Sequence, residues 1–260
     1  MTRRQSARLR RWALYLATLA LLAFLVARID WAKVGETMFD LDLAREQFPD
    51  IVTQAARNTL IFTVFGFSGG LVMGLLLALM RLSSLKPYRW FASVYIEIFR
   101  GLPALLTILF IGFGMPIALD VRIPFTYGAG SLALAVVSAA YMAETIRAGI
   151  EAVPKGQMEA ARSLGMSHTR AMVSIVIPQA FRIIIPPLTN ELVMLLKDTA
   201  LLAALGTTEA TEELTKFGRD GVSSSANTTP LVVAGFLYLM LTIPLTRVAA
   251  YLERRGRRAR

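Results

Sequence analysis

The sequence predicts an all-α membrane protein with six membrane-spanning helices. Of its 260 residues 55% are hydrophobic, and the mean hydropathy is +0.54, which is too apolar for a soluble domain of this length. The apolar residues form long blocks that match the thickness of a bilayer. Arginines collect at both termini and in short connections between the blocks. Because cytoplasmic segments carry such basic residues, we expect both termini to lie in the cytoplasm.

Composition and motifs also narrow the function. The net charge of +10 comes from basic residues that flank the apolar blocks, so we expect membrane lipid and no nucleic acid as a partner. The chain has no cysteine and one histidine, His168, which we interpret as a solvated loop residue. We therefore expect no metal site. It also contains no G-x-x-x-x-G-K-S/T, G-x-S-x-G or H-E-x-x-H motif, so we expect neither an enzyme nor an ATP-binding chain.

The N-terminal 50 residues form a unit of their own. A basic start is followed by the apolar run Trp12 to Ala27, which fits either a cleaved signal peptide or a retained signal anchor. No clear cleavage site follows, so we favour the anchor. The acidic segment from Ile29 to Asp50 should then lie outside. We expect the main membrane domain over residues 51–253 and a basic cytoplasmic tail over 254–260.

The second span runs from about Ala55 to Met80 and contains the pair Gly70 and Gly74. This G-x-x-x-G spacing permits close helix contact in lipid, and we favour packing within one subunit over a dimer seam. Arg81, Lys86 and Arg89 mark a cytoplasmic loop before the third span, which covers about Val94 to Leu119. A short outer loop should follow from Asp120 to Ala129.

Three further spans are expected, at about Gly130 to Ile150, Met172 to Leu196 and Leu231 to Tyr251. Pro178, Pro186 and Pro187 should break the fifth span, since proline removes a helix hydrogen bond. Lys197 and Asp198 mark its outer interface. A polar, loop-like segment is expected from Thr207 to Thr229.

The cytoplasmic loop from Ala152 to Arg170 contains a short predicted helix, Gln157 to Leu164. Pro154 suits its first turn, Gly165 its C-terminal cap, and Ser167 the start of the next helix. Met158, Ala161 and Leu164 recur every three residues and form a narrow apolar stripe. So short a helix is not stable alone, so it needs a partner surface.

Charged and polar residues inside the spans indicate either structural contacts or a path. Glu97 with Arg100, and Glu144 with Arg147, are three residues apart, so each pair shares a helix face. They are either structural ion pairs at the inner rim or part of an inner gate. Arg182, Thr189, Asn190 and Glu191 lie in the proline-rich fifth span, which either lines a translocation path or forms a packing kink.

Beyond these patterns, one long motif resembles a known family. Glu159-Ala160-Ala161, Gly165, Ile175 and Pro178 match the EAA loop of bacterial ABC importer permeases, EAA-x3-G-x9-I-x-L-P, except that Ile177 replaces the leucine. The flanks, Glu97-x-x-Arg100-Gly101-Leu102-Pro103, Glu144-x-x-Arg147 and Lys197-Asp198-Thr199-Ala200-Leu201, are similar to permeases for histidine, glutamate, glutamine, arginine and opines. The resemblance covers about Ala55 to Tyr251.

The resemblance implies a type I importer fold, with a five-helix permease core at 51–253 and one additional N-terminal helix, in the bacterial inner membrane. It implies a second permease subunit, an ABC ATP-binding subunit dimer that carries ATP and Mg²⁺, and an external substrate-binding protein. The helix around Met158 and Leu164 would dock on the ATPase, with Glu159 and Arg162 beside the apolar stripe. The alternatives are an importer of another small solute, a stand-alone secondary transporter or channel, and an assembly or signalling protein.

Overall fold

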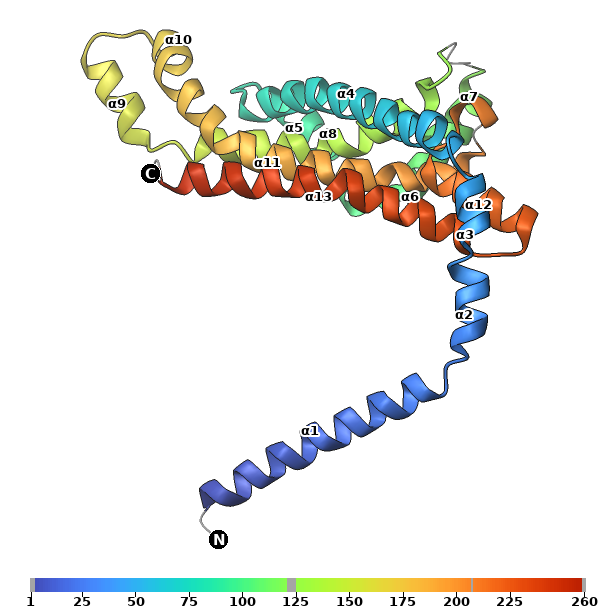
Figure 1. Ribbon diagram of the computed structural model, residues 1–260. Coiled ribbons are helices and arrows are strands. Elements are labelled where there is room, and N and C mark those ends of the chain that lie inside the picture. The colour runs from blue at the N-terminus through green and yellow to red at the C-terminus, as the bar shows by residue number, and fades with distance from the viewer. Residues whose placement is uncertain (1–2, 121–124, 207, 259–260) are drawn as a thin grey trace.

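A computed structural model of the chain describes residues 3–120, 125–206 and 208–258 (Figure 1), and over these residues it contains helices and no strand. The predicted all-α fold class is confirmed. Five helices are long and apolar enough to cross a membrane, or up to six if one bent pair is counted as a single span. The bundle lies beside an N-terminal arm.

The N-terminal arm consists of α1 (Arg3–Ala27), and the acidic segment after it forms α2 (Trp31–Met38) and α3 (Leu41–Glu46). The apolar segment Arg10–Ala27 of α1 is not buried against the rest of the protein, and the helix stands away from the bundle in Figure 1. By contrast, α2 and α3 are tied to it, because Thr228 N donates to Thr37 O at 2.8 Å and Asp40 N donates to Thr229 Oγ1 at 3.1 Å.

The centre of the bundle is the contact between α4 (Arg57–Leu82), which continues a π-helical turn at Ile51–Ala56, and α8 (Gly128–Glu151). Gly70 and Gly74 lie at the closest approach. A Cβ at Gly74 would lie 2.9 Å from Met142 Cβ and 3.1 Å from the backbone of α8. The predicted packing role of this glycine pair within one subunit is confirmed.

The expected third span is two helices rather than one. These are α5 (Lys86–Gly101) and α6 (Ala104–Leu109), which a π turn (Phe110–Gly114) and α7 (Met115–Leu119) extend. They are bent by 111°. The break lies at Leu102, whose ψ of 146° is extended, because the ring of Pro103 disfavours a helical conformation for the preceding residue. Of the expected loop after α7, residues 121–124 lie outside the described residues.

The prediction that prolines break the fifth span is wrong. A four-residue α10 (His168–Ala171) and a π turn (Met172–Val176) lead into α11 (Ile177–Asp198), which continues through Pro186 and Pro187. The fixed φ of proline suits a helix, and α11 packs against both α8 and α13 (Thr229–Arg258). These neighbours hold the helix where its own hydrogen bonds are missing.

The expected polar loop before the last span is also largely helical, while Thr207 itself lies outside the described residues. Two 3₁₀ turns (Thr199–Leu205 and Glu209–Thr211) precede α12 (Leu214–Ser225). Leu214 is fully buried, in a cluster with Ile51 and Ala55. Glu213 caps α12 by accepting from Lys216 N at 2.8 Å. The segment was predicted as a loop because it is polar, but it contains an amphipathic helix with a side-chain cap.

Candidate functional site

The predicted loop helix is present as α9 (Lys155–Ser163). It lies at one end of the bundle together with α10 and the C-terminus, and we call this the α9 end (Figure 1). Pro154 has a ψ of 129° and precedes the helix instead of forming its first turn. Ser167 caps α10 as expected, accepting a hydrogen bond from Arg170 N at 3.3 Å.

Gly165 terminates α9 in a left-handed conformation, with φ of +82°. The Gly165 N–H donates to Arg162 O at 3.0 Å, and the Met166 N–H donates to Ala161 O at 3.1 Å. These two bonds form a Schellman motif, which satisfies the last carbonyl groups of the helix. Residues with a Cβ adopt this φ at an energetic cost, so glycine is the residue that this reversal favours.

The apolar stripe of α9 is divided between two surroundings. Ala161 is 2% exposed and Met158 packs against the core of its own subunit, whereas Leu164 is 86% exposed. Residues six positions apart point in directions that differ by roughly 120° around a helix of 3.6 residues per turn. Met158 and Leu164 therefore lie on different faces. The outward surface at the C-terminal end of α9 therefore includes the capping residue Leu164 together with the exposed Glu159 and Ala160.

One hydrogen bond within the loop and one to α11 help to position α9. Arg162 Nη1 donates to Met166 O at 3.1 Å, across the reversal at Gly165. Gln179 Nε2, at the start of α11, donates to Gln157 Oε1 at 3.2 Å. Ile175 lies half-buried in the π turn, and Pro178 is the second residue of α11. The loop is thus positioned by an internal hydrogen bond and by a contact with α11.

One of the two predicted charge pairs is an ion pair in the structure. Arg147 Nε donates to Glu144 Oε2 at 3.1 Å, its Nη2 contacts the other oxygen of the same carboxylate, and its Nη1 contacts Glu151. Bidentate pairing of this kind is the stronger form of a charge-assisted hydrogen bond. It runs along the last turns of α8 toward the loop. Among the described residues, no ion pair joins Glu97 and Arg100.

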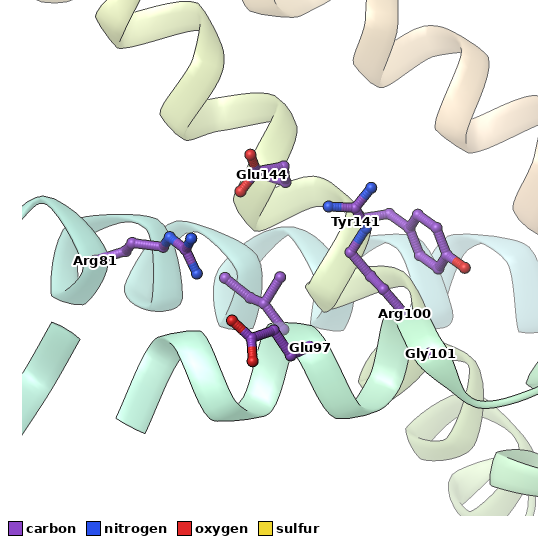
Figure 2. A pocket seen from close by; sticks show the side chains of 7 residues that line it. Arg81, Glu97, Arg100, Gly101, Tyr141 and Glu144 are labelled. Atoms are coloured by element: carbon purple, nitrogen blue, oxygen red, sulfur yellow. The ribbon is translucent and has the colours of Figure 1, made fainter. Parts of the chain in front are cut away.

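Glu97 and Arg100 instead line a charged cavity of about 370 Å³ between α4, α5 and α8. Figure 2 shows Arg81, Glu97, Arg100 and Glu144 around this space, and we call it the charged cavity. The guanidinium of Arg100 lies 5.6 Å from the ring centroid of Tyr141. Nη1 of Arg81 is buried and has no hydrogen-bond partner. Three elements therefore bring separate charges to one opening.

A second cavity of about 240 Å³ contains Glu191 and lies between α6, α8 and α11. Asp198, seven residues after Glu191, lines it as well, together with Ser138 and Tyr141. Tyr141 borders both cavities. The two spaces are thus neighbours along α8, with a tyrosine between them.

The other predicted path residues line neither of these two cavities. Arg182 is exposed on α11. Thr189 Oγ1 donates to Ile185 O of its own helix at 2.9 Å, and Asn190 Nδ2 donates to Glu253 of α13 at 2.7 Å. Asn190 therefore connects two helices, which agrees better with a packing role.

Sequence reasoning missed Arg81, Tyr141 and Asp198 as cavity residues. Tyr141 precedes Glu144 by three positions and Asp198 follows Glu191 by seven, so a shared helix face was readable in both cases. Arg81 was assigned to a basic loop, and only the packing of α4 turns it inward. Among the described residues, no group of three or more His, Cys, Asp or Glu side chains is placed to hold a metal ion.

Comparison with known proteins identifies the class to which this fold and loop belong. The family model described as "Binding-protein-dependent transport system inner membrane component" matches residues 70–258. A probable glutamine ABC transporter permease protein, GlnM of Bacillus subtilis, is 38% identical over 200 residues, covering 76% of this chain and 89% of GlnM. The arginine transport system permease protein ArtQ of the same organism is 36% identical over 216 residues, covering 83% and 96%.

The chain belongs to this family of inner membrane transport components, and it is a multi-pass membrane protein. A crystal structure of an amino acid ABC transporter with histidines matches with a TM-score of 0.75 and 38% identity, covering 83% of this chain and 98% of that one. A chain of the methionine transporter MetNI matches at 0.64 with 22% identity, covering 81% and 98%, which shows the fold alone. The type I ABC permease fold is thereby confirmed.

Proposed function

We propose that this chain is the permease subunit of an ATP-driven importer for polar amino acids. It forms the membrane path and is coupled to a separate ATPase through α9. Relatives named as glutamine and arginine permeases support the substrate class. The observation that carries the coupling role is the exposed apolar tip of α9, since Leu164 is 86% exposed and adjoins the motif residues Glu159 and Ala160.

The ATPase surface that fits this tip is an apolar groove with basic or neutral rims. Leu164 enters the groove, while the Glu159 carboxylate makes polar contacts at its edge. Gly165 sets the direction in which the chain leaves the groove. ATP and Mg²⁺ are bound by the partner ATPase, and this chain supplies the path and the coupling.

The subunit organisation follows from the same role. Residues 51–253 act as the permease domain, residues 1–50 add a membrane anchor, and residues 254–260 form a basic cytoplasmic tail. A second permease, either a copy of this chain or a sister subunit, completes the path. An external binding protein delivers the substrate at the end opposite α9.

Transport then follows from rigid-body movement. Closure of the ATPase pair moves the two α9 helices together, and the contacts of Gln157 and Met158 transmit this to α11 and the bundle. The charged cavity and the second cavity become accessible from opposite sides in turn.

The docking role predicts that Glu159→Lys and Gly165→Asp insert into the membrane normally but lose the ATPase and ATP-dependent uptake. Lysine reverses the charge at the groove edge, and aspartate strains a backbone with φ of +82°. Co-purification of the ATPase with tagged permease measures docking directly.

The matched control is Glu36→Lys, a reversal of an exposed charge on α2 at the opposite end of the bundle. This variant should retain the ATPase in full. Normal ATPase recovery and normal uptake in both α9 variants would refute the docking role.

A further inference from the structure

Two cations and two anions line the charged cavity, and no salt bridge joins any of them to another. Arg81 comes from α4, Glu97 and Arg100 from α5, and Glu144 from α8 (Figure 2). Among the described residues, the only ion pair that involves any of the four is that of Glu144 with Arg147. Two arginines and one glutamate therefore face the opening without a salt-bridge partner.

We propose that this cavity binds the α-carboxylate and α-ammonium groups of an amino acid, whatever its side chain. The proposal rests on the proposed function and adds to it an exit-side site near the α9 end. Its volume of about 370 Å³ falls within the roughly 300–1,000 Å³ of ligand pockets in proteins.

The carboxylate is assigned to the arginines. Nη1 of Arg81 is buried without a hydrogen-bond partner, and a buried donor in this state is costly until an acceptor arrives. Arg100 is exposed and lies 5.6 Å from the ring centroid of Tyr141, a cation–π contact that leaves its N–H groups available. Guanidinium groups match carboxylates in geometry and charge.

The ammonium group is assigned to Glu97, with Glu144 nearby. Glu97 has no cationic partner among the described residues, although Arg100 is only three positions away on the same helix. Glu144 is already bound to Arg147. A simple anion would leave Glu97 unpaired, whereas an amino acid backbone brings both charges within one small ligand.

Position connects this site to coupling. Glu144 binds Arg147, which contacts Glu151 at the end of α8, four residues before α9 begins. An amino acid in the cavity competes for the Glu144 carboxylate and so acts on the helix that leads into the docking loop. Accumulated amino acid on the cytoplasmic side should therefore slow further import.

The test uses the complete transporter in vesicles, with the α9 side facing the lumen. Radiolabelled glutamine uptake is measured after the lumen has been loaded with glycine, glycinamide or acetate. Glycine carries both charged groups, glycinamide lacks the carboxylate and acetate lacks the ammonium. We expect glycine alone to slow uptake, by threefold or more at saturating concentration. Equal effects of all three compounds would overturn the proposal.

The variants Arg81→Gln and Arg100→Gln should each weaken the glycine effect about tenfold in apparent affinity, as expected from the loss of one charge-assisted contact. Each is compared with its own rate in unloaded vesicles. The control, Arg89→Gln, removes an exposed charge from α5, the helix of Arg100, at a position outside the cavity, and it should be inhibited like the wild type. Undiminished inhibition of both cavity variants would also contradict the site.

A phosphatidylethanolamine headgroup carries the same pair of charges, so vesicles with and without this lipid form a second arm. The proposal requires glycine inhibition in vesicles without it, and a lipid site would show none. Direct binding of labelled glycine to the purified permease–ATPase complex separates the two claims. Glycine binding without any uptake would refute the proposed function alone, and uptake without glycine binding would refute this site alone.

Discussion

Glu213 is a fully buried carboxylate at the end of the bundle opposite α9, in a segment between the spanning helices. It accepts hydrogen bonds from Thr215 N at 2.6 Å, Lys216 N at 2.8 Å and the Tyr238 hydroxyl at 2.8 Å. Burial raises the pKa of Glu213, because the charged form loses its hydration, and the hydrogen bonds offset only part of this. The carboxylate therefore makes stability dependent on pH.

An acid whose pKa is higher in the folded than in the unfolded state stabilises the fold at low pH, and this stabilisation is lost as the pH rises through the folded value. The unfolded pKa of glutamate is about 4.3. We predict that the unfolding temperature of the wild type falls relative to that of Glu213→Gln as pH rises above this value. Thermal unfolding of the purified protein in detergent between pH 4.5 and 8 measures the difference.

Asp220 supplies the control, since its contact with Lys216 lowers its pKa. Its contribution is present above the unfolded pKa and is lost only as the pH falls through the lower, folded value. The difference between wild type and Asp220→Asn should therefore be flat over this range. A flat difference for Glu213→Gln as well would show that the buried carboxylate does not titrate there.

Local signals at single residues were readable from the sequence. Gly165 and Ser167 were predicted as helix-terminating and helix-starting residues, and both have those roles. Arg81 could not be predicted as a cavity residue, because an arginine after an apolar block is typical of a loop. Its inward position depends on how α4 packs against α5 and α8, which no local pattern encodes.

At the scale of elements, the contact of α4 with α8 shows how small residues shape the bundle. Gly66, Gly70 and Gly74 recur every four residues on one face of α4 and meet α8 closely. Such helices associate in lipid through van der Waals packing, which rises as the backbones approach. The charged cavity lies between α4, α5 and α8, so this contact also helps to set its shape.

We predict that Gly74→Ala destabilises the folded protein by about 1–3 kcal/mol, the usual cost of overpacking. The added Cβ would lie 3.1 Å from both Ala139 O and Ala143 N, and backbone atoms within a helix cannot move aside readily. Thermal unfolding in detergent measures the loss.

The matched control is Gly235→Ala in α13, where a Cβ would meet nothing within 4 Å. This variant should be as stable as the wild type or more stable, because alanine favours a helix over glycine. Equal unfolding temperatures for Gly74→Ala and Gly235→Ala would contradict the close-packing account.

Element boundaries were less predictable than their existence. Pro103 bends the third span by 111°, whereas Pro186 and Pro187 leave α11 continuous. The residue type is the same in both cases, and the difference lies in the neighbours, since α11 is held by α8 and α13. The sequence therefore indicates where a helix is weak, and tertiary packing decides whether it breaks.

At the scale of the whole molecule, the membrane class followed from composition, and the family followed from the spacing of the EAA loop. Neither signal places Arg81, Arg100 and Glu144 around one cavity. The cavity lies between α4, α5 and α8, and α8 is the helix that directly precedes α9 in the chain. The arrangement brings a candidate exit for amino acids next to the docking helix.

The most direct test of the proposed function is ATP-dependent uptake by vesicles that contain this chain, the ATPase that co-purifies with it and the external binding protein. Labelled glutamine, arginine, glutamate and histidine are compared with a sugar and an oxyanion. We predict that at least one polar amino acid accumulates, that accumulation requires ATP on the α9 side, and that the sugar and oxyanion are excluded. Uptake that continues without ATP or without the ATPase would contradict the proposed function.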